Sequence, residues 1–523
     1  MIHQASNQRL TYGELAEIAA QAPMPDPASI TLKDPKEFHI VGTPTGPIDN
    51  PQFVDGSAVF GLDVKVPGML YATIARCPVF GGRLVSFDAT GAKAVEGVQD
   101  VVEIDNAVAV VAENTWAAIQ GRQALQITWD EGQHATLNSE SIRQNILTQL
   151  PPTVAIGSDD TQAQTRGKLE VLYEIPYLAH ATMEPMNCVA HMSWNGGEVW
   201  APTQNPQGAF SQLPGGRLVR YIKRKLGTSF DLLKVNVTLI GGGFGRRLEV
   251  DYIGEAMQVS QAAGTPVQVA WTREDDIQHD FYHPLSYHYV SADLDPMAEM
   301  KQQSYYGPSE VRVGAWRSVE HFTQAFVQEC FVDELAAALG RDPYELRLER
   351  TQEPRLKAVL ELAASKANWG SPLPEGWGRG IACYATWGKS PTAEVVEVSV
   401  AHDGKVRVQR VICAIDCGIV INPDMVKAQV EGGIAFALSA ALKGKITLEK
   451  GRVQQSNFHD YPVLRFDEMP IVEVYIVPSN EPPSGVGEMS GPPLTPAVAN
   501  AVFAATGKRI RRIPIQGEDL RNA

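Results

Sequence analysis

The sequence predicts a mixed α+β protein that is divided into several subdomains. Between residues 39 and 130, short β-type runs (GSAVFGLDV, MLYATIA, VVEIDNAVAVVAE and ALQITWD) occur with one helix-like segment, NTWAAIQGRQAL, between the last two. Further along, strand-type and helix-type segments alternate, and no repeat of fixed period is visible. The 523 residues, 44% hydrophobic and 20% charged, have the composition of a globular protein with roughly three or four domain-sized units.

The chain is acidic. Its 60 Asp and Glu residues outnumber its 45 Lys and Arg residues, which gives a net charge of −15. Such a surface repels phosphate backbones, so no nucleic-acid partner is expected. A basic run near the carboxyl end is too short to reverse this charge, and we expect it to be the solvent-exposed end of a helix and strand. It consists of Lys508, Arg509, Arg511 and Arg512.

Neither a membrane span nor a signal peptide is expected. No uninterrupted apolar run approaches the length that crosses a bilayer. Residues 1–20 lack a charged region followed by an apolar one. We therefore expect a cytoplasmic protein, and a periplasmic location stays open if the true amino terminus lies upstream of Met1.

The first elements are a short helix and a linker. Thr11 and Glu14 have the spacing of a capping box, which predicts a helix over residues 11–20. The prolines at positions 23, 25 and 27 then predict a linker. The β-type runs that follow it predict a compact α+β domain.

A strand–helix–strand unit is predicted at residues 232–272. LLKVNVTLI has a strand pattern, GGGFGRR is a glycine turn, LEVDYIGEAMQVSQAAG is an amphipathic helix that ends at Gly264, and PVQVAWT is a further strand. A crossover helix between two strands favours a βαβ arrangement, with the glycine loop at the carboxyl end of the first strand.

The carboxyl-terminal part predicts further helices and a hairpin. A helix is expected over residues 325–340, and others begin at Asn422-Pro423 and Thr495-Pro496. VVEVSV and KVRVQRVICAI are joined by a His-Asp-Gly turn, which is typical of a hairpin. The stripes that the first two helices are expected to bury are Phe326, Cys330, Phe331 and Leu335, and Val426, Val430, Ile434 and Leu438.

The six cysteines lack the spacing of a disulfide framework, a zinc site or a ferredoxin-type cluster. Cys413 and Cys417 are four positions apart, but no second ligand pair accompanies them. We interpret both as ordinary core residues.

Two loops are candidate functional sites. In the loop at residues 241–247, glycines between a strand and a helix let backbone amides approach an anion, but the loop has neither a dinucleotide fingerprint nor a P-loop pattern. It fits a ligand contact and a tight packed turn equally well. In the second loop, Glu488 follows Gly485-Val486-Gly487, so a ligand could approach an exposed general base. A solvated loop glutamate is the alternative.

Several polar residues lie among apolar or small neighbours and could orient a bound group. Arg317, after Trp316, suits bidentate contacts to an oxyanion. Gln204, His180 and Glu184 are placed similarly, and for His180 the role of a satisfied core residue is favoured.

Together these segments resemble the molybdopterin-binding large subunit of the xanthine oxidase family of molybdenum hydroxylases, in the branch of isoquinoline 1-oxidoreductase beta subunits and related aldehyde dehydrogenases. The resemblance covers nearly the whole chain. The motifs that carry it include HATMEPMNCVAH, EVWAPTQNPQ, GGGFGRRLEVDYIGEA, VGAWRSVEHFTQAFVQECFVDELA, DCGIVINPDMVKAQVEGG, QSNFHDYPVLR and GVGEMSGPPLTPAVANAVFAATGKRIRRIPI.

The resemblance implies roles for individual residues. Glu488 corresponds to the catalytic base beside the molybdenum. The molybdenum would be held through the pterin, so no metal-ligating side chain is expected. The residues expected to contact the cofactor are Gly242, Gly243, Phe244, Gly245, Gln204, Trp316, Arg317 and Gly487.

The cofactor expected from the resemblance is molybdopterin with molybdenum, in the form of molybdopterin cytosine dinucleotide. In the family, the base takes a proton from a metal-bound hydroxyl, and the oxygen reaches an electron-poor carbon of an aldehyde or N-heteroaromatic substrate. Electrons then leave through iron–sulfur clusters. Because this chain has no cluster-type cysteine run, the clusters are expected in a separate small iron–sulfur subunit.

The resemblance also implies a domain organisation. A helix and linker over residues 1–39 would precede a hammerhead α/β domain over 40–135. Two mixed α+β molybdopterin-binding subdomains would follow, over 136–350 and 351–523.

The chain departs from the family pattern in two places that bear on function. Met1 falls where the family sequence is already past a segment that helps to hold the pterin, so we expect either that a separate chain supplies that segment or that the chain is a truncated reading frame. Met489 and Ser490 replace the usual Pro-Gly after the glutamate. The alternative is a cofactor-poor, non-catalytic remnant or scaffold with the same fold.

Overall fold

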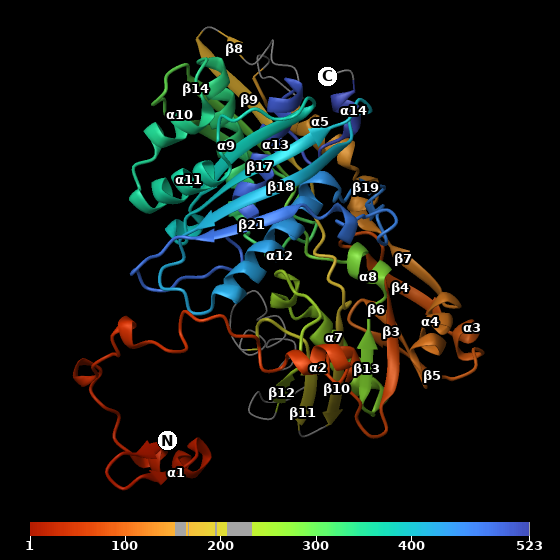
Figure 1. The fold of residues 1–523 in the computed structure, drawn as a ribbon. Coiled ribbons are helices and arrows are strands. Elements are labelled where there is room, and N and C mark those ends of the chain that lie inside the picture. Colours follow the sequence, from red (N-terminus) through yellow and green to blue (C-terminus); the bar gives the residue numbers. More distant parts are fainter. Residues whose placement is uncertain (152–163, 166, 194–195, 207–232, 522–523) are drawn as a thin grey trace.

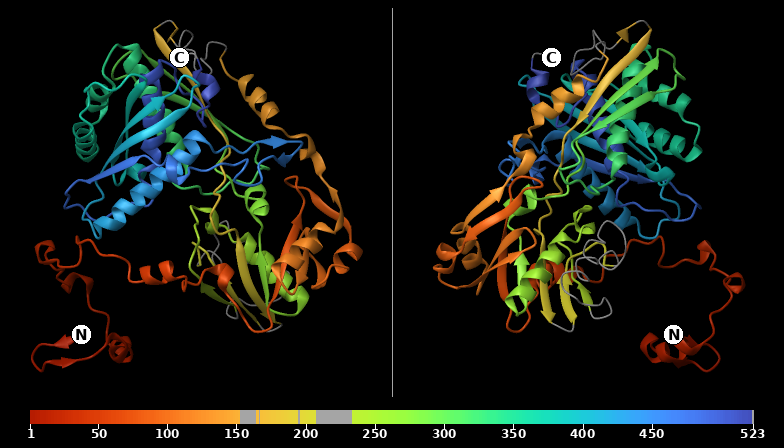
Figure 2. Two further views of the ribbon diagram at one scale, coloured as in Figure 1. Left: turned by 45° about the vertical axis from the view of Figure 1, so that its right-hand side comes forward. Right: turned by 180° about the vertical axis from the view of Figure 1, so that it is seen from behind.

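The computed structural model describes residues 1–151, 164–165, 167–193, 196–206 and 233–521. Two large sheets occupy opposite ends of the molecule (Figure 1). The first residues form an arm that extends away from the rest (Figure 2). In this arm, helix α1 (Tyr12–Gln21) begins at the predicted capping box of Thr11 and Glu14. The mixed α+β fold predicted from the sequence is therefore confirmed.

One end of the molecule contains a seven-stranded sheet with the order β12-β11-β10-β13-β3-β6-β5. Its strands come from both sides of residue 135, where the sequence analysis placed the end of the hammerhead domain. The domain boundaries given there remain predictions. The strands are β3 (Leu70–Arg76), β5 (Val98–Ile104), β6 (Ala107–Ala112), β10 (Asn187–Ser193), β11 (Gly196–Ala201), β12 (Leu233–Val237) and β13 (Val267–Ala270).

The predicted strand–helix–strand unit lies in this sheet. Helix α7 (Asp251–Ala263) connects β12 to β13 and ends at Gly264 in the left-handed conformation. The pairings β12–β11 parallel, β11–β10 antiparallel and β10–β13 antiparallel make β12 and β13 run in the same direction. The βαβ prediction is confirmed, with two strands inserted between its members.

One predicted β-type run has a different structure. GSAVFGLDV contains a 3-10 helix, Gly61–Asp63, because the Asp63 carboxylate accepts a hydrogen bond from the Phe60 amide (3.0 Å) and turns the chain. The other β-type runs of the 39–130 region form strands and its helix-like segment forms a helix, but the pattern did not predict the short helices Asn50–Asp55 and Thr90–Lys93. A two-stranded sheet and two helices lie beside the large sheet. These elements are β4 (Arg83–Asp88), β7 (Gln126–Asp130), α3 (Thr90–Lys93) and α4 (Thr115–Gln123).

The other end contains a four-stranded sheet with the order β16-β17-β18-β21. Strands β17 (Thr392–Val400) and β18 (Val406–Ile415) form the predicted hairpin. Helix α13 (Gly491–Thr506) packs closely on the sheet at Gly380 of β16 (Trp377–Tyr384). The absence of a side chain at Gly380 permits this contact, since a Cβ there would overlap the helix backbone. The remaining members are β21 (Ile471–Ile476) and the helix on the opposite face, α11 (Pro354–Lys366).

Helix α9 (Glu320–Ala338) runs through the core and buries its predicted apolar stripe. The predicted exposure of the basic run near the carboxyl end is wrong for two of its residues, because Arg509 and Arg511 are only 4% and 2% exposed. They pair with Asp333 (2.8 Å) and Glu334 (2.6 Å) of α9. Buried carboxylates on a helix, which the sequence pattern does not reveal, provide these partners.

Helix α12 (Pro423–Leu442) lies beside the carboxyl-terminal sheet. It is the one described helix that is long and apolar enough, by composition, to cross a membrane. In the structure its predicted stripe of Val426, Val430, Ile434 and Leu438 is buried in the protein core. This packing is that of a core helix.

A third sheet, β15-β14-β9-β8, lies against α9.

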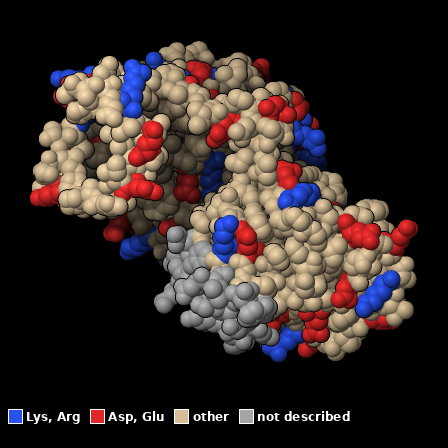
Figure 3. All heavy atoms as spheres, turned by 90° about the horizontal axis from the view of Figure 1, so that it is seen from below, with Lys and Arg blue, Asp and Glu red and all other residues tan. Residues whose placement is uncertain are grey.

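On the face in Figure 3, acidic and basic side chains are interspersed among the described residues. The remaining elements are β1 (Ile2–His3), β2 (Gln8–Arg9), α2 (Asn50–Asp55), α5 (Ser139–Leu147), β8 (Gln164–Thr165), β9 (Lys168–Ile175), α8 (Arg273–Gln278), β14 (Ser286–Asp293), β15 (Lys301–Tyr306), α10 (Pro343–Arg350), β19 (Leu448–Glu449), β20 (Arg452–Val453) and α14 (Gly517–Leu520).

Candidate functional site

The glycine loop between β12 and α7 is shaped by close contacts with two other segments. Gly242, Phe244 and Gly245 have φ values of 100°, 55° and 111°, which lie in the left-handed region. A Cβ at Gly243 would overlap the Gln204 side chain, and one at Gly245 would overlap the Ala315 carbonyl. The glycines are therefore required by packing within the protein.

Gln204, predicted to lie near the metal centre, is hydrogen-bonded to this loop. Its Oε1 accepts from the Gly245 backbone amide (3.1 Å), and the Gln204 backbone amide donates to the Arg247 carbonyl (3.0 Å). Two residues that are 41 positions apart in the chain thus belong to one structural unit, in which Gln204 sets the position of Gly245.

Glu184 anchors the start of the loop, a role that the sequence did not assign to it. Its Oε2 accepts from the Gly241 amide (2.8 Å) and from Arg247 Nη2 (3.1 Å). Its Oε1 accepts from the Leu62 amide (3.1 Å) and from Asn187 Nδ2 (2.9 Å). Both carboxylate oxygens are therefore used in holding the glycine loop to the amino-terminal region.

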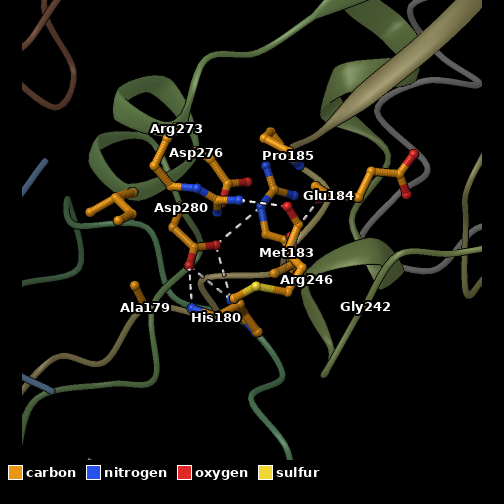
Figure 4. A network of polar contacts seen from close by, with 12 residues as sticks. Ala179, His180, Met183, Glu184, Pro185, Gly242, Arg246, Arg273, Asp276 and Asp280 are labelled. Atoms are coloured by element: carbon orange, nitrogen blue, oxygen red, sulfur yellow. Dashed lines mark hydrogen bonds and ion pairs between the residues drawn. The ribbon is translucent and has the colours of Figure 1, made fainter. Parts of the chain in front are cut away.

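A buried ionic network lies beneath the loop (Figure 4). Asp280 forms an ion pair with Arg246 (Oδ1 to Nε, 3.1 Å) and contacts His180 Nδ1 (2.9 Å), while His180 Nε2 contacts the Ala315 carbonyl (2.9 Å). Burial opposes ionisation of Asp280, but His180 and Arg246 outweigh it and lower the pKa of that carboxyl. The interpretation of His180 as a satisfied core residue agrees with these contacts.

An aromatic column joins the glycine loop to the Trp316-Arg317 segment. Phe244 stacks on Phe436 of α12, and Trp316 also stacks on Phe436, with centroid distances of 4.5 Å in both pairs. Trp316 Nε1 donates to the Ala179 carbonyl (3.3 Å). Phe436 was not among the predicted site residues. The sequence signal for a close contact in this part of α12 is the Gly432-Gly433 pair that precedes Phe436. A Cβ at Gly433 would overlap the Ser490 side chain, so the glycine lets the helix approach the Glu488 loop.

The same segment binds the Glu488 loop. Arg317 Nε donates to the Gly487 carbonyl (2.7 Å), and the Ser318 hydroxyl donates to the Glu488 carbonyl (2.7 Å). The Ser318 amide donates to Glu488 Oε1 (3.2 Å). Burial lowers the pKa of the Arg317 guanidinium, and the Glu488 carboxylate partly opposes that effect. Residues 315–318 therefore connect the two loops that the sequence singled out.

Unused hydrogen-bonding groups remain in both loops. Within the described residues, Glu488 Oε2 accepts no hydrogen bond, and the amides of Gly242, Gly243 and Phe244 donate none. A free carboxylate oxygen can accept a proton, and free amides can donate to an anionic or oxo group. These donors and this acceptor fit an anionic group that carries a reacting centre.

The described residues contain no group of three or more His, Cys, Asp or Glu side chains that could coordinate a metal ion. All six cysteines are free thiols, and five of them, including Cys413 and Cys417, are buried. Their interpretation as core residues is therefore confirmed.

Two family models, each described as a molybdopterin cofactor-binding domain, match residues 141–292 and 361–470. The chain is 30% identical to isoquinoline 1-oxidoreductase subunit beta of Brevundimonas diminuta, over 95% of this chain and 71% of that protein. The chain belongs to the xanthine oxidase family. It is a molybdopterin-binding subunit of these oxidoreductases, as the sequence motifs predicted.

A further relative and a solved structure are also similar to this xanthine oxidase-family subunit. It is 27% identical to the membrane-bound aldehyde dehydrogenase [pyrroloquinoline-quinone] of Gluconacetobacter polyoxogenes, over 94% of this chain and 74% of that protein. Its fold is similar to that of quinoline 2-oxidoreductase from Pseudomonas putida 86, with a TM-score of 0.77, 15% identity, and coverage of 92% and 98% of the two chains. The predicted family and fold class are thus confirmed, and the roles of individual site residues stay predictions.

Proposed function

We propose that this family member is the catalytic subunit of an enzyme that hydroxylates an aldehyde or N-heteroaromatic carbon with oxygen derived from water. The names of its relatives, an isoquinoline oxidoreductase and an aldehyde dehydrogenase, support both substrate classes. The observation that carries the proposal is the geometry of Glu488. One carboxylate oxygen is fixed by the Ser318 amide, and the other has no hydrogen-bond partner among the described residues.

The bound group is proposed to be molybdopterin cytosine dinucleotide with molybdenum. The two matches to the molybdopterin domain favour this group over the quinone in the name of one relative. The residues proposed to hold it are the free amides of Gly242, Gly243 and Phe244 and the neighbouring Gln204 and Trp316. When bound, it would supply the two-electron oxidation of the substrate carbon.

Glu488 would act as the general base. Its Oε2 would accept the proton from the water-derived nucleophile as the new carbon–oxygen bond forms. Ser318 holds the carboxylate through Oε1, and Arg317 fixes the preceding carbonyl of Gly487. Orientation by these contacts would keep the second oxygen directed toward the reacting group.

We also propose that electrons leave through a separate iron–sulfur subunit. The sequence has no cluster-type run of cysteines, and five of the six free cysteines are buried in the core. The relative's designation as a beta subunit supports an assembly of more than one chain.

The test is metal and nucleotide analysis of the chain co-expressed with an iron–sulfur subunit. We expect about one molybdenum atom per chain, release of cytidine monophosphate on acid hydrolysis, and oxidation of benzaldehyde or quinoline. Glu488→Gln should retain the metal but lose turnover by a factor of about 10²–10⁴, the usual contribution of a general base.

Glu481→Gln is the matched control, because Glu481 is exposed in the same connection between β21 and α13. It should retain both metal and turnover. A stable, metal-free complex would favour the non-catalytic scaffold instead, and normal turnover in Glu488→Gln would show that another group is the base.

A further inference from the structure

Strand β21 lies at the border of the carboxyl-terminal sheet (Figure 1). Its one neighbour in the sheet is β18, with which it pairs in parallel. The Val477 amide donates to the Ile415 carbonyl (2.8 Å), so the odd-numbered residues of β21 direct their backbone groups toward β18. The amides and carbonyls of Val472, Val474 and Ile476 therefore point away from the sheet. Within the described part of the chain, they have no hydrogen-bond partner.

This edge lacks the features that protect many edge strands from pairing with another chain. Such strands commonly carry a lysine, a proline or a bulge. The sequence of β21, Ile-Val-Glu-Val-Tyr-Ile, contains neither residue, and its pairing with β18 has no register shift. Ile471 at its start is 69% exposed, and Phe466 just before it is fully exposed. The β21 edge is therefore a surface that suits the addition of a further strand.

The backbone of β21 is complementary to that of a second copy. In an antiparallel pair centred on Val474, each Val474 faces its counterpart, and Val472 faces Ile476 of the other copy. Both contacts join residues whose amides and carbonyls point outward, so every outward group finds a partner. Prolines at positions 470 and 478 flank the strand. Moving the centre by one residue places one of them, which has no amide hydrogen, opposite an outward residue.

The same register also avoids a repulsion between like charges. Glu473 faces Tyr475 of the other copy, and the two Glu473 side chains are not opposite each other. Within its own chain, the Glu473 carboxylate accepts from Arg410 Nε (2.6 Å) and from the Tyr475 hydroxyl (2.7 Å). The chain has a net charge of −15, but at this edge the single carboxylate of β21 is already paired with a cation.

We propose that two copies of this chain associate through antiparallel pairing of their β21 strands, which joins the two carboxyl-terminal sheets into one continuous sheet. The two-fold axis passes through Val474, and the interface is closed because each copy contributes the same surface. A contact limited to one strand and its neighbours is small, so we expect a reversible dimer that depends on concentration. The inference goes beyond the proposed function, because it depends on neither cofactor nor substrate.

Sedimentation velocity of the full chain over a range of concentrations tests the proposal, and a reversible monomer–dimer equilibrium is expected. Tyr475→Glu would place a carboxylate opposite Glu473 twice in each dimer and should raise the dissociation constant. Tyr475→Lys would place a cation there and should lower it. Each change should be roughly 2–30-fold, the effect of two cross-strand charge pairs.

The matched controls are Gln303→Glu and Gln303→Lys, which introduce the same charges on the exposed edge strand β15. They should leave the dissociation constant within about twofold, since a cross-strand charge effect requires direct apposition. A single species of monomer mass at every concentration would overturn the proposal. So would shifts of the same sign in the two Tyr475 variants.

Hydrogen–deuterium exchange provides a second measurement that does not depend on a variant. The outward amides of Val472, Val474 and Ile476 should exchange more slowly as the protein concentration rises, because pairing protects them. Exchange that does not change with concentration would contradict the proposal. If these amides are fast at every concentration, the edge is open to solvent, and if they are slow, another segment covers it.

Discussion

At the scale of single residues, the site depends on side chains that fix backbone rather than on side chains that face a ligand. Arg317 and Gly487 are 170 positions apart, yet one hydrogen bond joins them. The family resemblance identified both residues, as well as Glu488 and the glycine loop. Ser318, Phe436 and the anchoring role of Glu184 were missed, because their importance arises from contacts between distant segments that no local pattern encodes.

The tight packing of the glycine loop gives a prediction about cofactor retention. Gly243→Ala should lower the molybdenum content of the purified complex, because the added Cβ overlaps the Gln204 side chain. Gln204→Ala removes that obstacle, so the double variant should retain more molybdenum than Gly243→Ala, although less than the unmodified chain because the contribution of Gln204 to cofactor binding is lost.

Gly245→Ala is the matched comparison for this prediction. Its Cβ would overlap the backbone carbonyl of Ala315, which a side-chain truncation leaves in place. Gln204→Ala should therefore fail to rescue it. Equal rescue of both glycine variants would contradict this account of the loop.

Asp276, near the ionic network, gives a prediction about pH. It is 3% exposed, and burial raises its pKa to about 6 from 3.8, although Arg273 opposes the shift. Between pH 3.8 and about pH 6, the Asp276 carboxyl is ionised in the unfolded chain but still protonated in the folded protein. Its contribution to the free energy of unfolding therefore falls as the pH rises through this range and stays low above about pH 6.

Asp276→Asn should consequently raise the thermal unfolding midpoint at pH 7.5 and change it little near pH 4. Differential scanning calorimetry of both proteins at the two pH values measures the difference. A shift of the same size at both values would mean that ionisation of Asp276 is not the cause.

At the scale of elements, sequence periodicity was a good guide to individual helices and strands. The capping box of α1, the β17–β18 hairpin and the buried stripe of α12 were all predicted. The order of the seven-stranded sheet was not, because it depends on pairing between remote strands such as β3 and β13. The burial of Arg511 was missed for a similar reason, since its partner is 177 positions away.

The buried pair of Arg511 and Glu334 should be costly to break. Arg511→Met leaves the Glu334 carboxylate in the core without its cation, which typically destabilises a protein by about 3–5 kcal/mol. Lys168→Met is the control, because it breaks an ion pair with Asp293 whose side chains are 57% and 75% exposed.

The control should cost less than about 1 kcal/mol. Urea unfolding of the two variants, followed by circular dichroism, compares these effects. Similar midpoints for both variants would show that the core pair contributes no more than a surface pair.

At the scale of the whole molecule, the fold brings a central loop and a carboxyl-terminal loop to one place. Residues 315–318 and Phe436 of α12 form the connection between them. The sequence predicted the two loops, and the resemblance predicted that they share a cofactor. How they are joined depends on tertiary packing and became visible only in the structure.

The central claim is that the glycine loop and Glu488 flank one molybdenum-bearing cofactor. An anomalous difference map collected at the molybdenum edge, from crystals of the loaded complex, tests it most directly. The account predicts a single peak between the Glu488 carboxylate and the amides of Gly243 and Phe244. A peak elsewhere in the chain, with these two loops packed against protein alone, would contradict it.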